Sequence, residues 1–153
     1  MISSILVTDD GTESSDKAIE KASELAKQMN VLLILLHVID DIGMPRTLVL
    51  GNDKPAIEVA RVTIGKAIEK GWRQRAKTII DKLEKEEKIP NVRSHCVWGV
   101  ASEEILKFAE RNKIDMIVMG PGKRLKGFSK IGALGSVTRK VSELANCPVL
   151  IVH

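Results

Sequence analysis

Two clusters of residues in this sequence could bind a ligand. The segment Thr8–Thr12 has the sequence Thr-Asp-Asp-Gly-Thr and follows an aliphatic run, and Gly120-Pro121-Gly122 follows another. Gly135 and Ser136 then precede a helical pattern. Glycine lets a ligand approach the backbone closely, and the first turn of a helix offers unpaired N–H groups to anions. The glycine pair and the Gly-Ser helix start therefore predict a phosphate-binding site, in which Ser136 adds a hydroxyl donor.

The stretch between the two glycine groups is basic. It holds four cationic residues and no acidic one: Lys123, Arg124, Lys126 and Lys130. A cationic lid over an anionic ligand and a solvated charge run both fit this composition. The net charge of the whole chain is only +4, which is a mild excess. The sequence leaves both interpretations of the basic stretch open.

Five aliphatic runs are predicted to be β-strands. They are short and mostly continuous in apolar residues, which is typical of strands that are covered on both faces. The runs are Ile2–Thr8, Val31–Val38, Val92–Trp98, Ile114–Met119 and Pro148–Val152. Because Arg93, Ser94 and His95 interrupt the third run, we expect that strand at an edge of the sheet.

Apolar residues at helical spacing predict a helix between successive strands, within residues 18–29, 64–83, 102–109 and 137–145. Ser102 is placed to cap the third helix, and Asp41–Pro55 is predicted to be a long loop. This alternation predicts one α/β domain over residues 1–153, a doubly wound five-stranded parallel sheet of order 3-2-1-4-5 with helices on both faces. Ligands bind such sheets where the strand order reverses, here at the carboxyl ends of the first and fourth strands.

Six short motifs are spread over nearly the whole chain except the predicted loop. They are Ile5-Leu6-Val7 with Asp10-Gly11-Thr12, Leu36-His37-Val38-Ile39-Asp40, Gly99 with Glu103-Glu104-Ile105-Leu106, Asp115-Met116-Ile117-Val118-Met119-Gly120, Gly135-Ser136-Val137-Thr138 and Cys147-Pro148-Val149-Leu150-Ile151-Val152. Taken together, these motifs resemble the universal stress protein family.

The resemblance implies a site for ATP, alone or with Mg²⁺. The nucleotide-binding branch of the family carries G-x-x-G-x9-G-[ST] around the phosphates. The resemblance also implies that Asp10 lies near the adenine edge or ribose and that Val38 lines the adenine pocket. This chain departs from that motif in two spacings. One residue separates Gly120 from Gly122, where the motif has two, and twelve residues separate Gly122 from Gly135, where the motif has nine. Asp9 also adds a negative charge near the ligand. The candidate binding residues are Thr8, Asp9, Asp10, Val38, Met119, Gly120, Gly122, Gly135, Ser136 and Val137.

The other motifs do not favour an enzyme. Asp9-Asp10 after a first strand also suits a phosphoryl-accepting receiver domain, but the run that would carry its acceptor aspartate ends in Gly120 instead. The sequence has no G-x-x-x-x-G-K-[ST] loop and no G-x-S-x-G motif. We therefore predict no catalytic residue.

The histidines and tryptophans have simpler interpretations. His37, His95 and His153 have no metal-ligand spacing, so we predict no metal site. Trp72 and Trp98 are assigned to the core or to an interface. Aromatic residues make up only 3% of the chain, which leaves few platforms for stacking nucleic acid bases.

Two functions remain. The first is a stress-response regulatory protein that binds an adenine nucleotide with little or no catalysis and acts on a regulatory protein that the sequence does not name. The second is a dimer that binds no nucleotide and works through protein contacts. In both, we expect the last strand to lie at a sheet edge and to pair two copies into a homodimer. Since no signal peptide or membrane-spanning run is recognised, the cytoplasm is the expected compartment.

Overall fold

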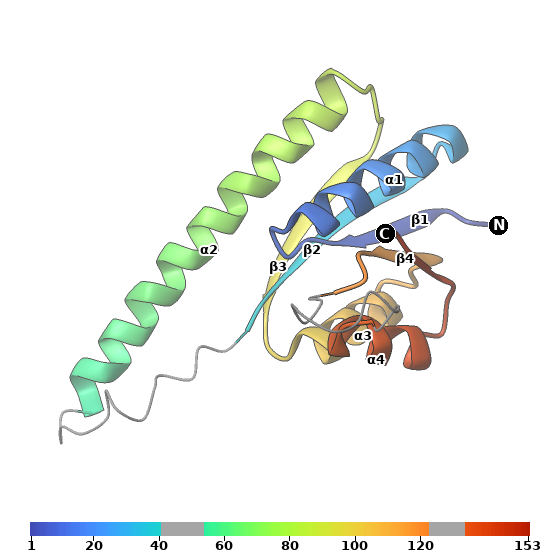
Figure 1. Cartoon of the computed structure of the whole chain (residues 1–153). Coiled ribbons are helices and arrows are strands. Elements are labelled where there is room, and N and C mark those ends of the chain that lie inside the picture. Colours follow the sequence, from blue (N-terminus) through green and yellow to red (C-terminus); the bar gives the residue numbers. More distant parts are fainter. Residues whose placement is uncertain (41–53, 123–133) are drawn as a thin grey trace.

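A computed structural model describes residues 1–40, 54–122 and 134–153 of the chain (Figure 1). Strands and helices alternate along these residues. They are β1 (Ser4–Thr8), α1 (Glu13–Met29), β2 (Leu32–Ile39), α2 (Lys54–Lys85), β3 (Val92–Trp98), α3 (Ala101–Arg111), β4 (Met116–Met119), α4 (Ser136–Leu144) and β5 (Val149–Ile151). Among the helices described, none combines the length and apolar character that crossing a membrane requires.

The strands form one parallel sheet in the order β3-β2-β1-β4-β5. This confirms the predicted order and the edge position of β3. At the centre, Thr8 of β1 is in register with Leu36 of β2, and Val7 is in register with Val118 of β4. The chain builds outward from β1 to β3 and then crosses back to β4. The strand order therefore reverses between β1 and β4, which makes their carboxyl ends the topological switch point.

Helices cover both faces of the sheet, as predicted (Figure 1). The helix α1 and the C-terminal half of α2 pack on one face, where Val7 and Ala22 share a core. The helices α3 and α4 pack on the other face, where Leu6 contacts the cluster that contains Ile105 and Val141. Successive strand residues point to opposite faces of a sheet, so the continuous apolar runs supply both cores.

Asp115 ties the amino ends of β1 and β4 together. Its Oδ2 atom accepts hydrogen bonds from the backbone N–H and the hydroxyl of Ser3, at 2.8 and 2.7 Å, and from those of Ser4, at 3.0 and 3.2 Å. These bonds lower the pKa of Asp115 to about 2, so the side chain is ionised at neutral pH. The amino ends of β1 and β4 are thus fixed to each other, at the end of these strands that lies opposite the switch point.

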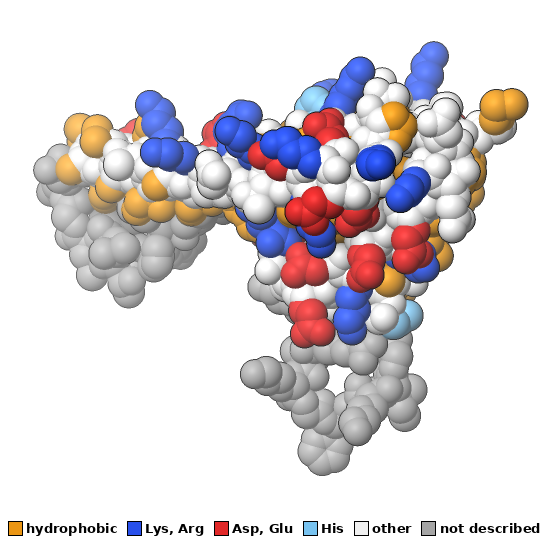
Figure 2. Space-filling view, turned by 90° about the horizontal axis from the view of Figure 1, so that it is seen from above, with side chains coloured by type: hydrophobic (Ala, Val, Ile, Leu, Met, Phe, Trp, Pro, Cys, Tyr) orange, Lys and Arg blue, Asp and Glu red, His pale blue; other side chains and the backbone are white. Residues whose placement is uncertain are grey.

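The helix α2 differs most from its predicted extent. It begins at Lys54 and not near residue 64, and Pro55 lies in its first turn, where helices accept proline. Lys54 and Pro55 were predicted to be loop, and that part of the prediction is wrong. The remaining loop prediction, residues 41–53, lies outside the described residues. The N-terminal half of α2 projects beyond the sheet (Figures 1 and 2). On this half, Val59 is 66% exposed and Ile64 is 45% exposed.

The predicted cap of α3 is also wrong. The N-cap residue is Val100, and Ser102 lies inside the helix. Ser102 is buried with Ile105 and Ala109, which follow it by three and seven residues and so lie on the same helix face. Its hydroxyl therefore belongs to the packed face of α3 and does not cap the helix.

Candidate functional site

A cleft of about 470 Å³ opens at the switch point, among the carboxyl ends of β1, β2 and β4 and the first turns of α1, α3 and α4. Its size is that of a typical small-molecule site. The structure brings all the candidate residues named from the sequence to the wall of this cleft: Thr8, Asp9, Asp10, Val38, Met119, Gly120, Gly122, Gly135, Ser136 and Val137.

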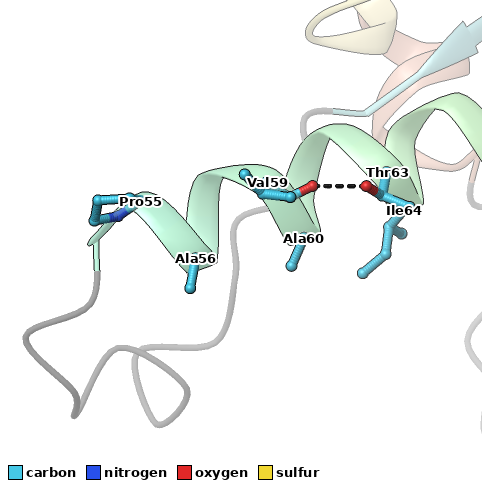
Figure 3. Close-up of a pocket in the computed structure, with 6 residues that line it drawn as sticks. All are labelled: Pro55, Ala56, Val59, Ala60, Thr63 and Ile64. Carbon is cyan, nitrogen blue, oxygen red and sulfur yellow. Dashed lines mark hydrogen bonds between the residues drawn. The ribbon is translucent and has the colours of Figure 1, made fainter.

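A second hollow, of about 560 Å³, runs along the projecting half of α2 (Figure 3). Its lining is mainly apolar: Pro55, Ala56, Val59, Ala60, Thr63 and Ile64. The hydroxyl of Thr63 donates to the carbonyl oxygen of Val59 at 2.8 Å, so it is already used within the helix. Since small-molecule sites need a few placed polar groups, the switch-point cleft is the better candidate.

Asp9 is buried at the end of β1, where its carboxylate has several partners. Oδ1 accepts from the Gly11 N–H at 2.9 Å and from the Ser15 hydroxyl at 3.1 Å. Arg75 of α2 adds two hydrogen bonds, Nε to Oδ2 at 2.8 Å and Nη2 to Oδ1 at 3.0 Å. Asp9 lines the cleft as expected, but its negative charge is paired with Arg75.

Arg75 also reaches the first turn of α1. Its Nη2 atom donates to Oδ1 of Asp16 at 2.6 Å. The two hydrogen bonds to Asp9, and then the one to Asp16, raise the pKa of Arg75 above its ordinary value, so this guanidinium is permanently charged. One side chain of α2 thus joins the end of β1 to the start of α1.

Asp10 is exposed beside this buried pair. Its Oδ1 atom accepts from the Thr12 N–H at 3.0 Å and from the Thr12 hydroxyl at 2.5 Å. Partial burial of Asp10 opposes ionisation, but the hydrogen bonds from Thr12 outweigh it, and the net effect lowers the pKa of Asp10. The cleft therefore carries an ionised carboxylate that can accept hydrogen bonds from ligand hydroxyls.

His37 and Trp72 form an aromatic pair next to this turn. The His37 Nδ1 atom lies 2.5 Å from the Asp9 carbonyl oxygen, and since that oxygen only accepts, Nδ1 donates. Burial lowers the pKa of His37, so the ring is neutral at physiological pH. The Trp72 indole stacks on it with an interplanar angle of 17°. A Cβ atom at Gly11 would lie 2.8 Å from the indole, so the ring also packs closely on the turn.

Sequence reasoning missed Trp72 and Arg75 as residues of the site. Trp72 lines the cleft, whereas we had assigned it to the core or to an interface. The available signal was spacing: Arg75 follows Trp72 by three residues and precedes Ile79 by four, so it lies on the apolar face of α2. A charged residue on that face requires a buried partner, but the sequence does not say which one.

Close backbone approach explains the glycines at the other end of the cleft. Gly122 has a φ of +85°, and a Cβ there would lie 2.8 Å from the Gly135 Cα atom. The Gly135 N–H donates to the Pro121 carbonyl at 2.8 Å, and the buried Thr138 hydroxyl donates to the Gly120 carbonyl at 3.0 Å. These contacts bring the first turn of α4 against the end of β4.

The start of α4 can bind an anion. Gly135 is its N-cap and has no side-chain acceptor for the N–H groups of the first turn, which contains no acidic residue. Such N–H groups, with the positive end of the helix dipole, favour a phosphate or carboxylate. The predicted contribution of Lys123, Arg124, Lys126 and Lys130 lies outside the described residues. Within the described ranges, no group of three or more His, Cys, Asp or Glu side chains could hold a metal ion.

The fold and the cleft define a doubly wound α/β protein with a cleft at its topological switch point. The model of the universal stress protein family matches residues 1–153, and the chain belongs to that family. This confirms the resemblance found in the sequence. Universal stress protein YxiE of Bacillus subtilis is 29% identical over 155 residues, a match that covers 100% of each chain.

Solved structures support the fold. Universal stress protein UspA from Lactobacillus plantarum matches with a TM-score of 0.72 and 22% identity, over 99% of this chain and 97% of that one. A universal stress protein in complex with cAMP matches with a TM-score of 0.66 and 24% identity, again over 99% and 97%. At these identities the likeness shows the fold alone.

The Arg75–Asp9 pair is expected to be a large contributor to stability. Arg75→Ala should lower the free energy of unfolding by about 3 kcal/mol, because it leaves a buried carboxylate without its cation. Arg73→Ala is the matched control, since it breaks an exposed ion pair with Glu69 on the same helix and should change little. Urea denaturation compares the two variants. Equal stability of both would contradict the structural weight given to the buried pair.

The glycine at position 122 is expected to be irreplaceable. Gly122→Ala should cost about 1–3 kcal/mol, because alanine is strained at this φ and its Cβ would meet the backbone of Gly135. Gly71 of α2 is the control, since an added Cβ there meets nothing within 4 Å. Alanine at position 71 should stabilise the helix by about 0.5–1 kcal/mol. Thermal melts that shift in the same direction for both variants would refute this explanation.

Proposed function

We propose that this protein is a stress-response regulatory protein that binds an adenine nucleotide in the switch-point cleft. The observation that carries the proposal is that the cleft has two chemically different ends. One end is mainly apolar and aromatic with two exposed carboxylates, Asp10 and Asp40, and the other is built from glycine backbone and a helix start. A nucleotide has matching parts, since its base is a planar ring system with apolar faces, its ribose carries hydroxyls and its phosphates are anionic.

The base and ribose belong at the end formed by β1 and β2. Val38, Leu36 and Ile105 give this end an apolar wall. Asp10 lies at its border and, as an ionised acceptor, suits the ribose hydroxyls. This arrangement agrees with the roles that the family resemblance implies for Asp10 and Val38.

The phosphates belong at the end formed by β4 and α4. Gly122 and Gly135 line this end of the cleft, so its wall there is backbone, and Ser136 adds an exposed hydroxyl at the helix start. A relative of this fold has been solved with cAMP, so the fold can accept an adenine nucleotide. The shortened glycine pair of this chain still lines the same cleft as Gly135, which supports phosphate binding despite the altered spacing.

We assign binding and not catalysis to the cleft. His37 is the imidazole that could act as a base among the described cleft residues, but it is stacked against Trp72 and bonded to a backbone carbonyl. The Ser15 hydroxyl is bonded to Asp9 and to the Thr12 carbonyl. A nucleotide held without a nearby nucleophile–base pair suits a regulatory signal.

Calorimetry with ATP, ADP and AMP, each with and without Mg²⁺, tests the proposal. We expect saturable binding and a higher melting temperature at millimolar nucleotide, because a ligand that binds only the native state stabilises it. Asp10→Asn should weaken ATP binding about tenfold, since it removes a charged hydrogen-bond acceptor. Glu13→Gln is the control, because Glu13 lies in the same segment but outside the cleft.

Absence of both heat and thermal shift with all three nucleotides would refute the proposal. The alternative function, a dimer that acts through protein contacts without a nucleotide, would then be favoured. Unequal responses among ATP, ADP and AMP would show which of the three nucleotides the cleft prefers.

We also propose that two copies of the chain form a homodimer by pairing their edge strands β5. This strand pairs with β4 on one side, and Leu150 on it is 36% exposed. An apolar edge strand invites pairing with another copy, and a two-fold axis would join two such edges antiparallel.

Leu150→Lys should convert the dimer into a monomer, because the charge would have to be buried at the pairing edge. Val100→Lys is the matched control, since Val100 is also exposed but follows β3 at the opposite edge of the sheet. Sedimentation at tens of micromolar protein should show a dimer for the unmodified chain and for the Val100 variant. A monomeric unmodified protein would refute the dimer.

A further inference from the structure

Two side chains of α2 hold the turn that carries Asp10. The Arg75 guanidinium binds Asp9 with two hydrogen bonds, at 2.8 and 3.0 Å, and binds Asp16 with a third at 2.6 Å. The Trp72 indole packs over Gly11, one residue beyond Asp10. We call Trp72 and Arg75 the α2 clamp.

The clamp fixes both neighbours of Asp10 in the chain. Asp9 precedes it and is held through its buried carboxylate, and its carbonyl oxygen accepts from His37, which is itself stacked against Trp72. Gly11 follows Asp10, has a φ of +76° and leaves no room for a side chain under the indole. The position of the Asp10 carboxylate is therefore set by contacts that come from α2 and β2.

Asp10 itself has weaker anchors. It is exposed, and its Oδ1 atom accepts from Thr12 within the same turn. A carboxylate held mainly by its own turn moves with that turn. If the α2 contacts loosen, the distance from Asp10 to the phosphate end of the cleft is no longer fixed, and a ligand that must reach both ends loses one of its contacts.

We infer that Trp72 and Arg75 are positioning residues for nucleotide binding, which hold Asp10 at the distance from the α4 start that a bound nucleotide requires. The inference rests on the proposed function. It makes α2 part of the binding site, although the clamp residues lie far along this helix and not at the carboxyl end of β1 or β4. It also links occupancy of the cleft to the attachment of α2, whose other half projects from the body (Figure 1).

A double-mutant cycle separates positioning from general stability. Arg75→Lys keeps the charge beside Asp9 but loses the planar two-pronged contact, and it is compared with Asp10→Asn alone and with the double variant. Calorimetric titration with ATP measures the dissociation constant of each folded protein, and thermal melts verify folding. If the clamp acts through Asp10, each single variant should weaken ATP binding by about fivefold to tenfold, and the double variant should be within about twofold of the weaker single variant.

Trp72→Leu supplies a second, independent cycle. It keeps an apolar side chain over Gly11 but removes the ring that stacks on His37, so it tests the clamp without touching the buried ion pair. The same coupling to Asp10→Asn is expected. This variant decides the question if Arg75→Lys does not fold.

Failure of the positioning role and failure of the proposed function would give different results. ATP affinities of the clamp variants equal to that of the unmodified protein would overturn the positioning role and leave the proposed function intact. Effects that multiply in the double variants would also overturn it, since they would show that the clamp and Asp10 act independently. If the unmodified protein binds no ATP at millimolar concentration, the proposed function fails and this inference fails with it.

Discussion

The buried carboxylate of Asp9 needs a cation, and Arg75 of α2 supplies it. An unpaired charge at this depth would cost several kcal/mol, so the pair fixes how α2 attaches to the switch point. The chain positions are 66 residues apart, yet this contact joins the end of β1, the start of α1 and the middle of α2. The shape of the cleft at its β1 end follows from that single requirement.

The other end of the cleft depends on backbone and not on charge. Gly122 and Gly135 come within a distance that excludes a Cβ atom, which brings the start of α4 beside the end of β4. The parallel order places β1 next to β4, so the two ends open into one cleft. A ligand with an apolar ring and an anionic tail fits this division better than a uniformly polar or apolar one.

The sequence was sufficient for the sheet order, which follows from the succession of aliphatic runs. It also named ten residues of the cleft wall, most of them at strand ends and Val38 through the family resemblance, but not Asp40 or Trp72. It was insufficient for contacts made by helix side chains across the fold. The Arg75 partner could not be deduced, since Asp9, Asp10 and Asp16 are all acidic and near one another in sequence. The N-terminal half of α2 has little sheet to face, so its helical extent was underestimated, and Ser102 was misassigned because serine favours caps more often than packed faces.

In the proposed complex, one nucleotide spans both ends of the cleft. Amide chemical shifts of ¹⁵N-labelled protein during titration with ATP test it most directly, because Gly11 and Ser136 report the two ends separately. Both amides should shift along the same saturation curve, with an equal dissociation constant. Saturable shifts confined to one end, or none at either end at millimolar ATP, would contradict it.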